Sequence, residues 1–193
     1  MPLGANKVAL LGSSGVVTDT SILLATGVAS ASASIEFTLP TAYKQVKFGF
    51  YNITPATNAQ HFQFQVNASG QTGYNETVTS TSFQAGHAES DSWQHFQKIW
   101  GSQAQGTGYE LLMPSVGNGA DMAGAGELVF YDPASTIYVK QFHGVTSSHY
   151  DNPGVNHSFY GGYINTTTNL SGISFKFSSG NIASGTIKMW GIR

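Results

Sequence analysis

The sequence contains no cysteine and few charged residues. Without cysteine, there can be neither a disulfide framework nor a thiolate metal site. Charged side chains make up 9% of the 193 residues, whereas typical soluble domains have about 25%. A surface built from Ser, Thr, Asn, Gln and Gly cannot rely on charge repulsion to stay monomeric. It suits packed assemblies, or carbohydrate contacts made through hydrogen bonds. The net charge of −2 gives no reason to expect nucleic-acid binding.

Long apolar runs and a targeting signal are also missing. No run approaches the roughly 20 apolar residues of a membrane span, so we expect no membrane insertion. The first 15 residues hold one lysine, Lys7, and a short apolar run at residues 8–11, which is far shorter than the core of a signal peptide. These absences predict assembly in a cytosol, and a host bacterial cytoplasm fits them.

Catalytic and metal-binding motifs are missing in the same way. The sequence has no His-Glu-x-x-His motif and no Gly-x-Ser-x-Gly elbow. Residues 87–95 place two histidines near two carboxylates, which could serve a metal ion, but a polar loop over an aromatic anchor is the simpler interpretation. A glycosidase pair formed by distant carboxylates such as Asp121 and Asp151 stays open. We therefore predict a non-enzyme with no catalytic residue, no metal and no cofactor.

Alternating hydrophobicity is the main structural signal in the chain. Ile173, Phe175 and Phe177 alternate with polar residues, which is typical of a half-buried strand. Similar patterns predict strands at residues 21–27, 33–38, 43–52, 60–67, 77–83, 109–113, 127–132, 136–145, 159–167, 170–178 and 186–192. Residues 92–100 fit a short helical turn or an irregular strand. The fold class predicted is all-β: one antiparallel β-sandwich domain, jelly-roll-like, over residues 20–193.

The segments between the predicted strands give three further expectations. Short polar loops join residues 43–52 to 60–67 and residues 170–178 to 186–192, so both pairs are predicted to form antiparallel hairpins. Many glycines between residues 68 and 126 predict long, irregular loops. Residues 1–19 are predicted to be an irregular N-terminal arm.

Two sequence blocks resemble a family of virion structural proteins from tailed bacteriophages. Residues 179–185 read SGNIASG, and the chain ends in MWGIR at residues 189–193, an aromatic-Gly-Ile-basic ending. Upstream, ASASIEF at residues 31–37 precedes LPTAYKQVKF at residues 39–48. Members of the family are found in tail fibres, tail appendages and capsid decorations. The resemblance implies a virion role without selecting the part of the virion.

These observations together predict a non-enzymatic, self-associating virion subunit. Its expected partners are itself, as a homotrimer, other capsid or tail proteins, and a glycan of the host surface. The absence of coiled-coil heptads, which would build a shaft, favours a capsid decoration or short appendage over a long fibre. The alternative is a carbohydrate-binding β-sandwich module or a glycan-degrading enzyme. The support for this alternative comes from the aromatic residues in the loops.

Aromatic residues in or beside glycine-rich loops are the candidate binding residues. They are Trp93, Trp100, Tyr109, Tyr150 and Tyr160. Exposed aromatic rings near planar amides suit sugar stacking or a protein interface. The alternative is that each ring covers the core beneath a loop. We expect residues 87–109 and 147–157 to form the recognition surface. His143 occupies an apolar strand position and is predicted to be a core histidine.

Overall fold

A computed structural model describes residues 21–193, and these residues form an all-β fold without helices. Every strand pairing is antiparallel, which confirms the predicted fold class. The strands are β1 (Ser21–Ser32), β2 (Ile35–Thr38), β3 (Gln45–Pro55), β4 (Gln60–Ala68), β5 (Val78–Ala88), β6 (Gln94–Lys98), β7 (Ala104–Gly106), β8 (Glu110–Val116), β9 (Gly124–Tyr131), β10 (Lys140–Tyr150), β11 (Gly154–Ile164), β12 (Leu170–Phe177) and β13 (Ile182–Ile192). The predicted N-terminal arm lies outside the described residues. Residues 21–193 include no helix that could span a membrane.

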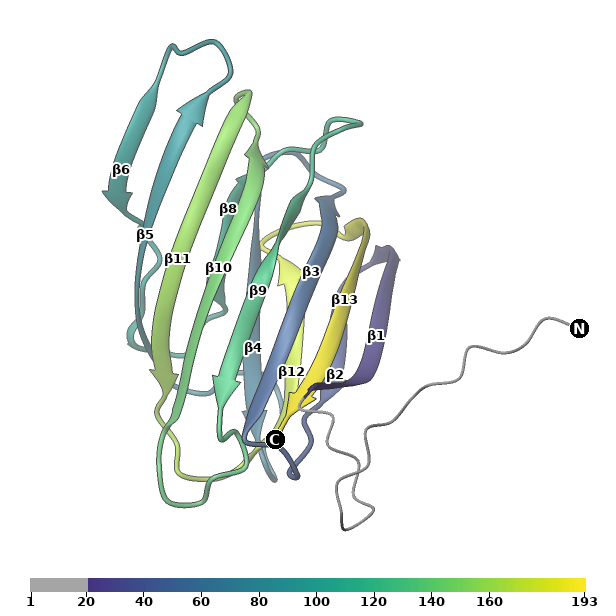
Figure 1. Ribbon diagram of the computed structural model, residues 1–193, viewed down its shortest axis with the longest axis vertical. Coiled ribbons are helices and arrows are strands. Elements are labelled where there is room, and N and C mark those ends of the chain that lie inside the picture. The colour runs from purple at the N-terminus through teal and green to yellow at the C-terminus, as the bar shows by residue number, and fades with distance from the viewer. Residues whose placement is uncertain (1–20) are drawn as a thin grey trace, which may run out of the picture.

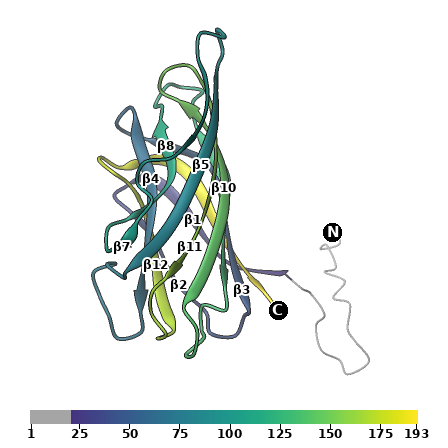
Figure 2. The same ribbon diagram turned by 90° about the vertical axis from the view of Figure 1, so that its left-hand side faces the viewer.

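Eight strands form a jelly roll of two layers. The first layer has the order β1-β13-β3-β9, and the second has the order β2-β12-β4-β8. Figure 1 shows the first layer in front of the second, and Figure 2 shows the two layers side by side. One antiparallel bridge, Tyr150 with Val116, joins strands of the two layers, so all described strands belong to one hydrogen-bonded sheet. Two four-stranded layers connected by repeated crossings are the jelly-roll arrangement.

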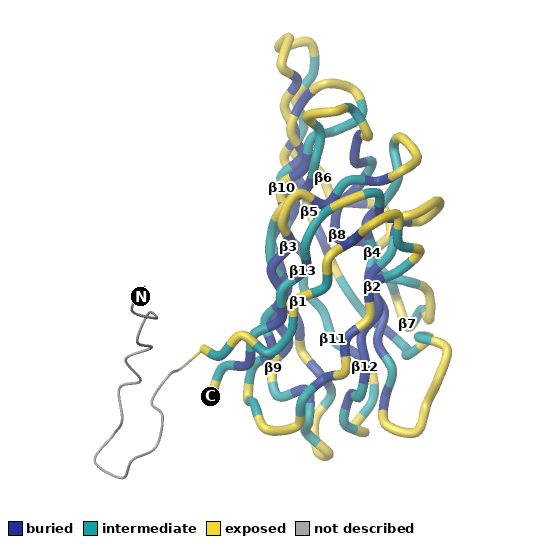
Figure 3. Tube along the Cα trace, turned by 90° about the vertical axis from the view of Figure 1, so that its right-hand side faces the viewer, coloured by how far each residue is buried: buried dark blue, intermediate teal, exposed yellow. Residues whose placement is uncertain are grey.

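Phenylalanine fills the space between the layers. Nine of the chain's 12 phenylalanines are buried, and they are Phe37, Phe48, Phe50, Phe62, Phe64, Phe130, Phe142, Phe175 and Phe177. Their rings meet mainly edge to face, as Phe48 and Phe175 do at a centroid distance of 5.2 Å, which is the favoured geometry for aromatic pairs. Figure 3 shows buried residues along the strands of both layers.

The two predicted hairpins are wrong, because each pair of strands crosses from one layer to the other. β3 pairs with β13 and β9, whereas β4 pairs with β12 and β8. In the same way, β12 pairs with β4 and β2, and β13 with β1 and β3. The apolar faces of consecutive strands therefore point at each other across the core, as the contact between Phe50 and Phe62 shows. A short polar loop connects an arch between layers as readily as it connects a hairpin.

Five further strands extend the first layer beyond the jelly roll. β10 pairs with β9, β11 with β10, and β5 with β11, while β6 and β7 pair with β5. β5 to β7 are inserted between β4 and β8, and β10 and β11 between β9 and β12. Figure 1 shows the β5–β6 hairpin reaching past the second layer. We call these five strands the extension.

The extension includes stretches that the sequence predicted as loops, although β5, β10 and β11 overlap the strands predicted at residues 77–83, 136–145 and 159–167. Residues 92–100, which fitted a helical turn or an irregular strand, contain the strand β6. β5 and β8 overlap the strands predicted at residues 77–83 and 109–113 but are longer, so the long irregular loops expected between residues 68 and 126 are largely wrong. Residues 147–157 are mostly strand, because β10 ends at Tyr150 and β11 begins at Gly154. The predicted core position of His143 is also wrong: it lies on the outer face, where its ring stacks on Tyr131.

Candidate binding site

Three of the five candidate aromatic residues come together at one end of the extension. Trp93, Trp100 and Tyr150 line a hollow of about 310 Å³ between the inner face of the extension and the end of β8. We call it the aromatic hollow. Its lining residues are Gln84, Trp93, His95, Gln97, Trp100, Pro114, Ser115, Tyr150, Asn152 and Asn156. None of them is Asp, Glu, Lys or Arg.

The other two candidates lie elsewhere. Tyr160 is buried, and its hydroxyl donates to the backbone oxygen of Glu127 at 3.3 Å. Burial raises the pKa of Tyr160 well above its usual range. Tyr109 lies beside β12, donates to Ser174 Oγ at 3.2 Å, and holds the Lys176 ammonium 4.2 Å from its ring centroid. The structure therefore does not bring Tyr109 and Tyr160 to the aromatic hollow.

Two aromatic rings pack against Trp93, one stacked on it and the other edge to face. Its ring stacks on His95 with a centroid distance of 5.5 Å and meets Tyr150 edge to face at 5.7 Å. Gly154 makes room for the ring, because a Cβ at that position would lie 2.6 Å from Trp93 Cζ2. Trp93 is half-buried. It thus forms a fixed wall of the hollow.

Trp100, by contrast, presents its ring to solvent and is 65% exposed. Its ring packs edge to face with the ring of His61, at a centroid distance of 4.7 Å. His61 Nδ1 accepts a hydrogen bond from the backbone N–H of Ser115 at 2.9 Å, which ties this contact to the end of β8. Partial burial lowers the pKa of His61, although the carboxylate of Asp151 acts in the opposite direction.

Polar groups without partners surround the hollow. Three buried atoms of the lining have no hydrogen-bond partner among the described residues: Gln84 Oε1, Trp93 Nε1 and Asn156 Oδ1. The same is true of Ser158 Oγ, and Ser158 lies opposite Gln84 in the pairing of β11 with β5. Gln84 is 6% exposed and Asn156 is 1% exposed. An unsatisfied buried polar group costs about 1–3 kcal/mol. Such groups gathered at one place indicate a position where another molecule supplies the missing hydrogen bonds.

One amide of the hollow is partly satisfied. Gln84 Nε2 lies 3.0 Å from His95 Nε2, so the amide N–H donates to the imidazole and leaves the carbonyl oxygen free. Gly86 provides the space for this arrangement, because a Cβ there would lie 2.6 Å from His95 Nε2 and 2.7 Å from Asn156 Oδ1. The free oxygens of Gln84 and Asn156 therefore belong to one compact polar floor.

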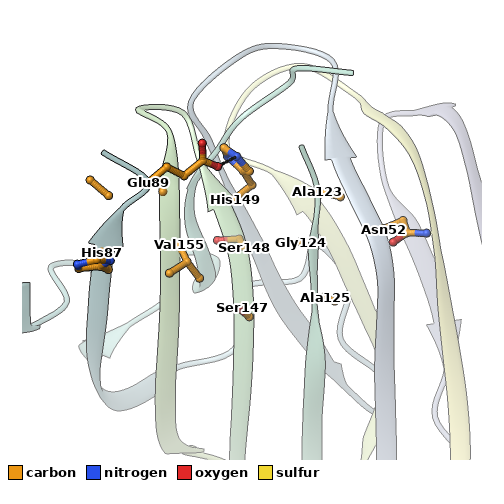
Figure 4. A pocket seen from close by; sticks show the side chains of 12 residues that line it. Asn52, His87, Glu89, Ala123, Gly124, Ala125, Ser147, Ser148, His149 and Val155 are labelled. Atoms are coloured by element: carbon orange, nitrogen blue, oxygen red, sulfur yellow. Dashed lines mark hydrogen bonds and ion pairs between the residues drawn. The ribbon is translucent and has the colours of Figure 1, made fainter. Parts of the chain in front are cut away.

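A second hollow, of about 460 Å³, is lined by His87 and Glu89, two of the residues that the sequence suggested for a metal ion, and by His149. It lies on the other side of β10 and β11, and Figure 4 shows Glu89 and His149 pointing toward each other there. His149 Nε2 lies 3.1 Å from Glu89 Oε1, and His149 Nδ1 donates to the backbone oxygen of Tyr150 at 2.9 Å. Both ring nitrogens are engaged, so neither is free to activate a nucleophile.

The nearby His87 pairs separately with Asp91 at 3.0 Å. In Figure 4, His87 lies apart from Glu89 and His149. Within residues 21–193, no group of three or more such side chains is placed to hold a metal ion. The residues at 87–95 that could serve a metal ion are therefore separated: His87 contacts Asp91, Glu89 contacts His149, and His95 contacts Gln84.

The outer face of the extension carries the three phenylalanines that are absent from the core. Phe83 and Phe159 stack at a centroid distance of 5.0 Å, and Phe83 meets Phe96 at 5.6 Å. Phe96 is 76% exposed and Phe83 is 43% exposed. Val145 lies opposite Phe159 in register on β10. We call Phe83, Phe96, Phe159 and Val145 the outer aromatic stripe, which crosses four adjacent strands.

Comparison with known proteins adds no relatives to this description. No protein-family model matches the chain, and no curated protein sequence matches it.

Proposed function

We propose that this protein is a non-enzymatic structural subunit of a tailed-bacteriophage virion, part of a capsid decoration or a tail fibre or appendage. It self-associates, as a trimer, through the outer aromatic stripe. The observation that carries the proposal is the exposure of this stripe on a single chain. The resemblance of two sequence blocks to virion proteins and the low content of charge support it.

The stripe has the composition of an interface centre rather than of ordinary surface. Exposed apolar patches on soluble chains mark interaction sites, and aromatic residues are enriched at the centres of interfaces. The jelly-roll half of the same outer face is different, because Lys47 and Glu127 form an ion pair there. Lys188 lies above the ring of Tyr51 at 5.5 Å. Among residues 21–193, the exposed phenylalanines therefore lie on the extension alone.

Light scattering combined with size-exclusion chromatography tests the proposal. The wild-type chain should elute with a mass about three times its own 20.5 kDa. Phe96→Ser removes the most exposed ring of the stripe and should shift the protein toward the monomer. Tyr138→Ser is the matched control, because Tyr138 is 71% exposed in the loop between β9 and β10, far from the stripe. A wild-type monomer, or equal masses for all three proteins, would overturn the proposal.

A second candidate function is a carbohydrate-binding module that works outside a virion. The aromatic hollow favours it, since exposed tryptophan beside amide groups is a common way to hold sugars. A stable monomer with saturable sugar binding would support this alternative over the virion subunit.

A further inference from the structure

The aromatic hollow offers hydrogen-bonding groups of both kinds beside an apolar ring. Gln84 Oε1 and Asn156 Oδ1 are acceptors, and Trp93 Nε1–H is a donor, all without partners among the described residues. The exposed ring of Trp100 stands in the same lining. A ligand that satisfies this set needs adjacent groups that both donate and accept, together with an apolar face that covers an aromatic ring.

A pyranose ring has this combination of groups. Its hydroxyls each donate and accept, and its C–H faces pack against indole rings. Gln84 and Asn156 are more than nine-tenths buried and cannot turn freely toward solvent, so their positions are preorganised for such hydroxyls. The volume of about 310 Å³ admits one or two sugar units rather than a longer chain inside the hollow.

Charge narrows the class of sugar further. The lining has no lysine or arginine to pair with a carboxylate, and its free groups at Gln84 and Asn156 are oxygen acceptors that repel an anion. An acidic sugar would lose its hydration without a compensating ion pair. The favoured ligand is therefore a neutral sugar.

We propose that the aromatic hollow binds a neutral pyranose unit of a polysaccharide. Trp100 is the stacking surface, Trp93 donates through its indole N–H, and Gln84 and Asn156 accept from the sugar hydroxyls. This assignment does not rest on self-association through the outer aromatic stripe. Phe96 and Trp100 belong to different surfaces of the extension, so either proposal can fail alone.

Indole N–H signals in ¹⁵N-edited NMR spectra of the full chain provide the test. The chain has three tryptophans, and Trp190 on β13 is an internal control because it packs over Gly49 of the neighbouring strand β3. The probes are the methyl glycosides of glucose, galactose and N-acetylglucosamine, with glucuronate as the anionic probe. At least one neutral sugar should shift the Trp93 and Trp100 signals saturably and leave Trp190 unchanged.

Variants make the assignment specific. Trp100→Ala should weaken the affinity for the neutral sugar at least about tenfold, which is similar to the loss when an aromatic side chain is removed from beneath a stacked nucleobase. Trp100→Phe should restore part of the affinity. Tyr138→Ala is the control, because Tyr138 is similarly exposed but lies in the loop between β9 and β10, outside the lining of the hollow. This variant should bind the sugar as the wild type does. Chemical shifts of the remaining signals show whether each variant is folded.

Three results would overturn the proposal. One is that no neutral sugar shifts the two signals at tens of millimolar, which would mean that the hollow holds water only. Another is that glucuronate binds as well as the neutral sugars. The third is that Trp100→Ala, while folded, binds the sugar as tightly as the wild type.

Discussion

Trp93 and Trp100 lie seven positions apart, yet their surroundings differ. Trp93 packs flat on His95 and over Gly154, whereas Trp100 is mostly in solvent. We expect Trp93→Ala to lower the free energy of unfolding by roughly 2 kcal/mol, since a half-buried ring loses part of the 3–5 kcal/mol seen for core rings. Trp100→Ala should change it by less than about 0.5 kcal/mol. Urea unfolding of both variants measures this, and equal losses would contradict the geometry.

Glu110 is the residue whose titration should be visible in stability. Its carboxyl is almost fully buried, and burial raises its pKa from 4.5 to about 7, although a hydrogen bond donated by Ser80 acts in the opposite direction. The folded state therefore holds a proton that the unfolded state releases. Glu110 should lower the free energy of unfolding as pH rises from 4.5 to 7, by about 3 kcal/mol in total.

The variant Glu110→Gln isolates this effect from the titration of the histidines. It keeps an oxygen that accepts from Ser80 but has no proton to lose. Unfolding of both proteins in urea at pH 5 and pH 8 should show the variant gaining stability relative to the wild type at the higher pH. A difference between the two proteins that is constant with pH would refute the assignment.

The residues that sequence reasoning missed are polar side chains on an inward face. Gln84 and Ser82 alternate with Phe83, so the pattern resembles a strand with its apolar side inward and its polar side in water. The structure has the reverse, with Phe83 outside and the polar residues inside. Alternation gives the period of a strand but not which face is buried. The one feature of the sequence that pointed to this site is Trp93, which follows the strand containing Gln84 by a few residues.

At the scale of elements, strand existence was predictable and strand pairing was not. Alternation located β2, β3, β4, β9, β12 and β13 within a few residues. The same residues cannot distinguish a hairpin from an arch, because both have inward apolar faces and a short polar loop. Pairing is decided by contacts between residues far apart in sequence, such as Phe64 with Phe142.

β13 is the element on which we expect the first layer to depend. It lies between β1 and β3, with Ile187 opposite Gly27 on one side and Phe50 on the other. Removing residues 185–193 would leave both neighbours with unpaired edges and open the core beside Ile187. We predict that the truncated chain yields no soluble folded protein, whereas removing Arg193 alone changes nothing. Soluble yield and circular dichroism measure this, and an unchanged melting profile would contradict it.

At the scale of the whole molecule, the two insertions carry both candidate surfaces. The jelly roll supplies the phenylalanine core, and the extension supplies the outer aromatic stripe on one face and the aromatic hollow on the other. A stable scaffold with function in added segments is a common arrangement. In an assembly, the stripe would be covered by neighbouring subunits while the hollow at the end of the extension stays open.

Electron cryomicroscopy of the virion that we propose to contain this protein tests the central claim most directly. The account predicts density for several copies of the jelly roll on the capsid or tail, with the outer aromatic stripes turned toward neighbouring subunits and Trp100 at the open surface. Absence of the protein from purified virions, or copies whose stripes face solvent while other surfaces meet, would contradict the account.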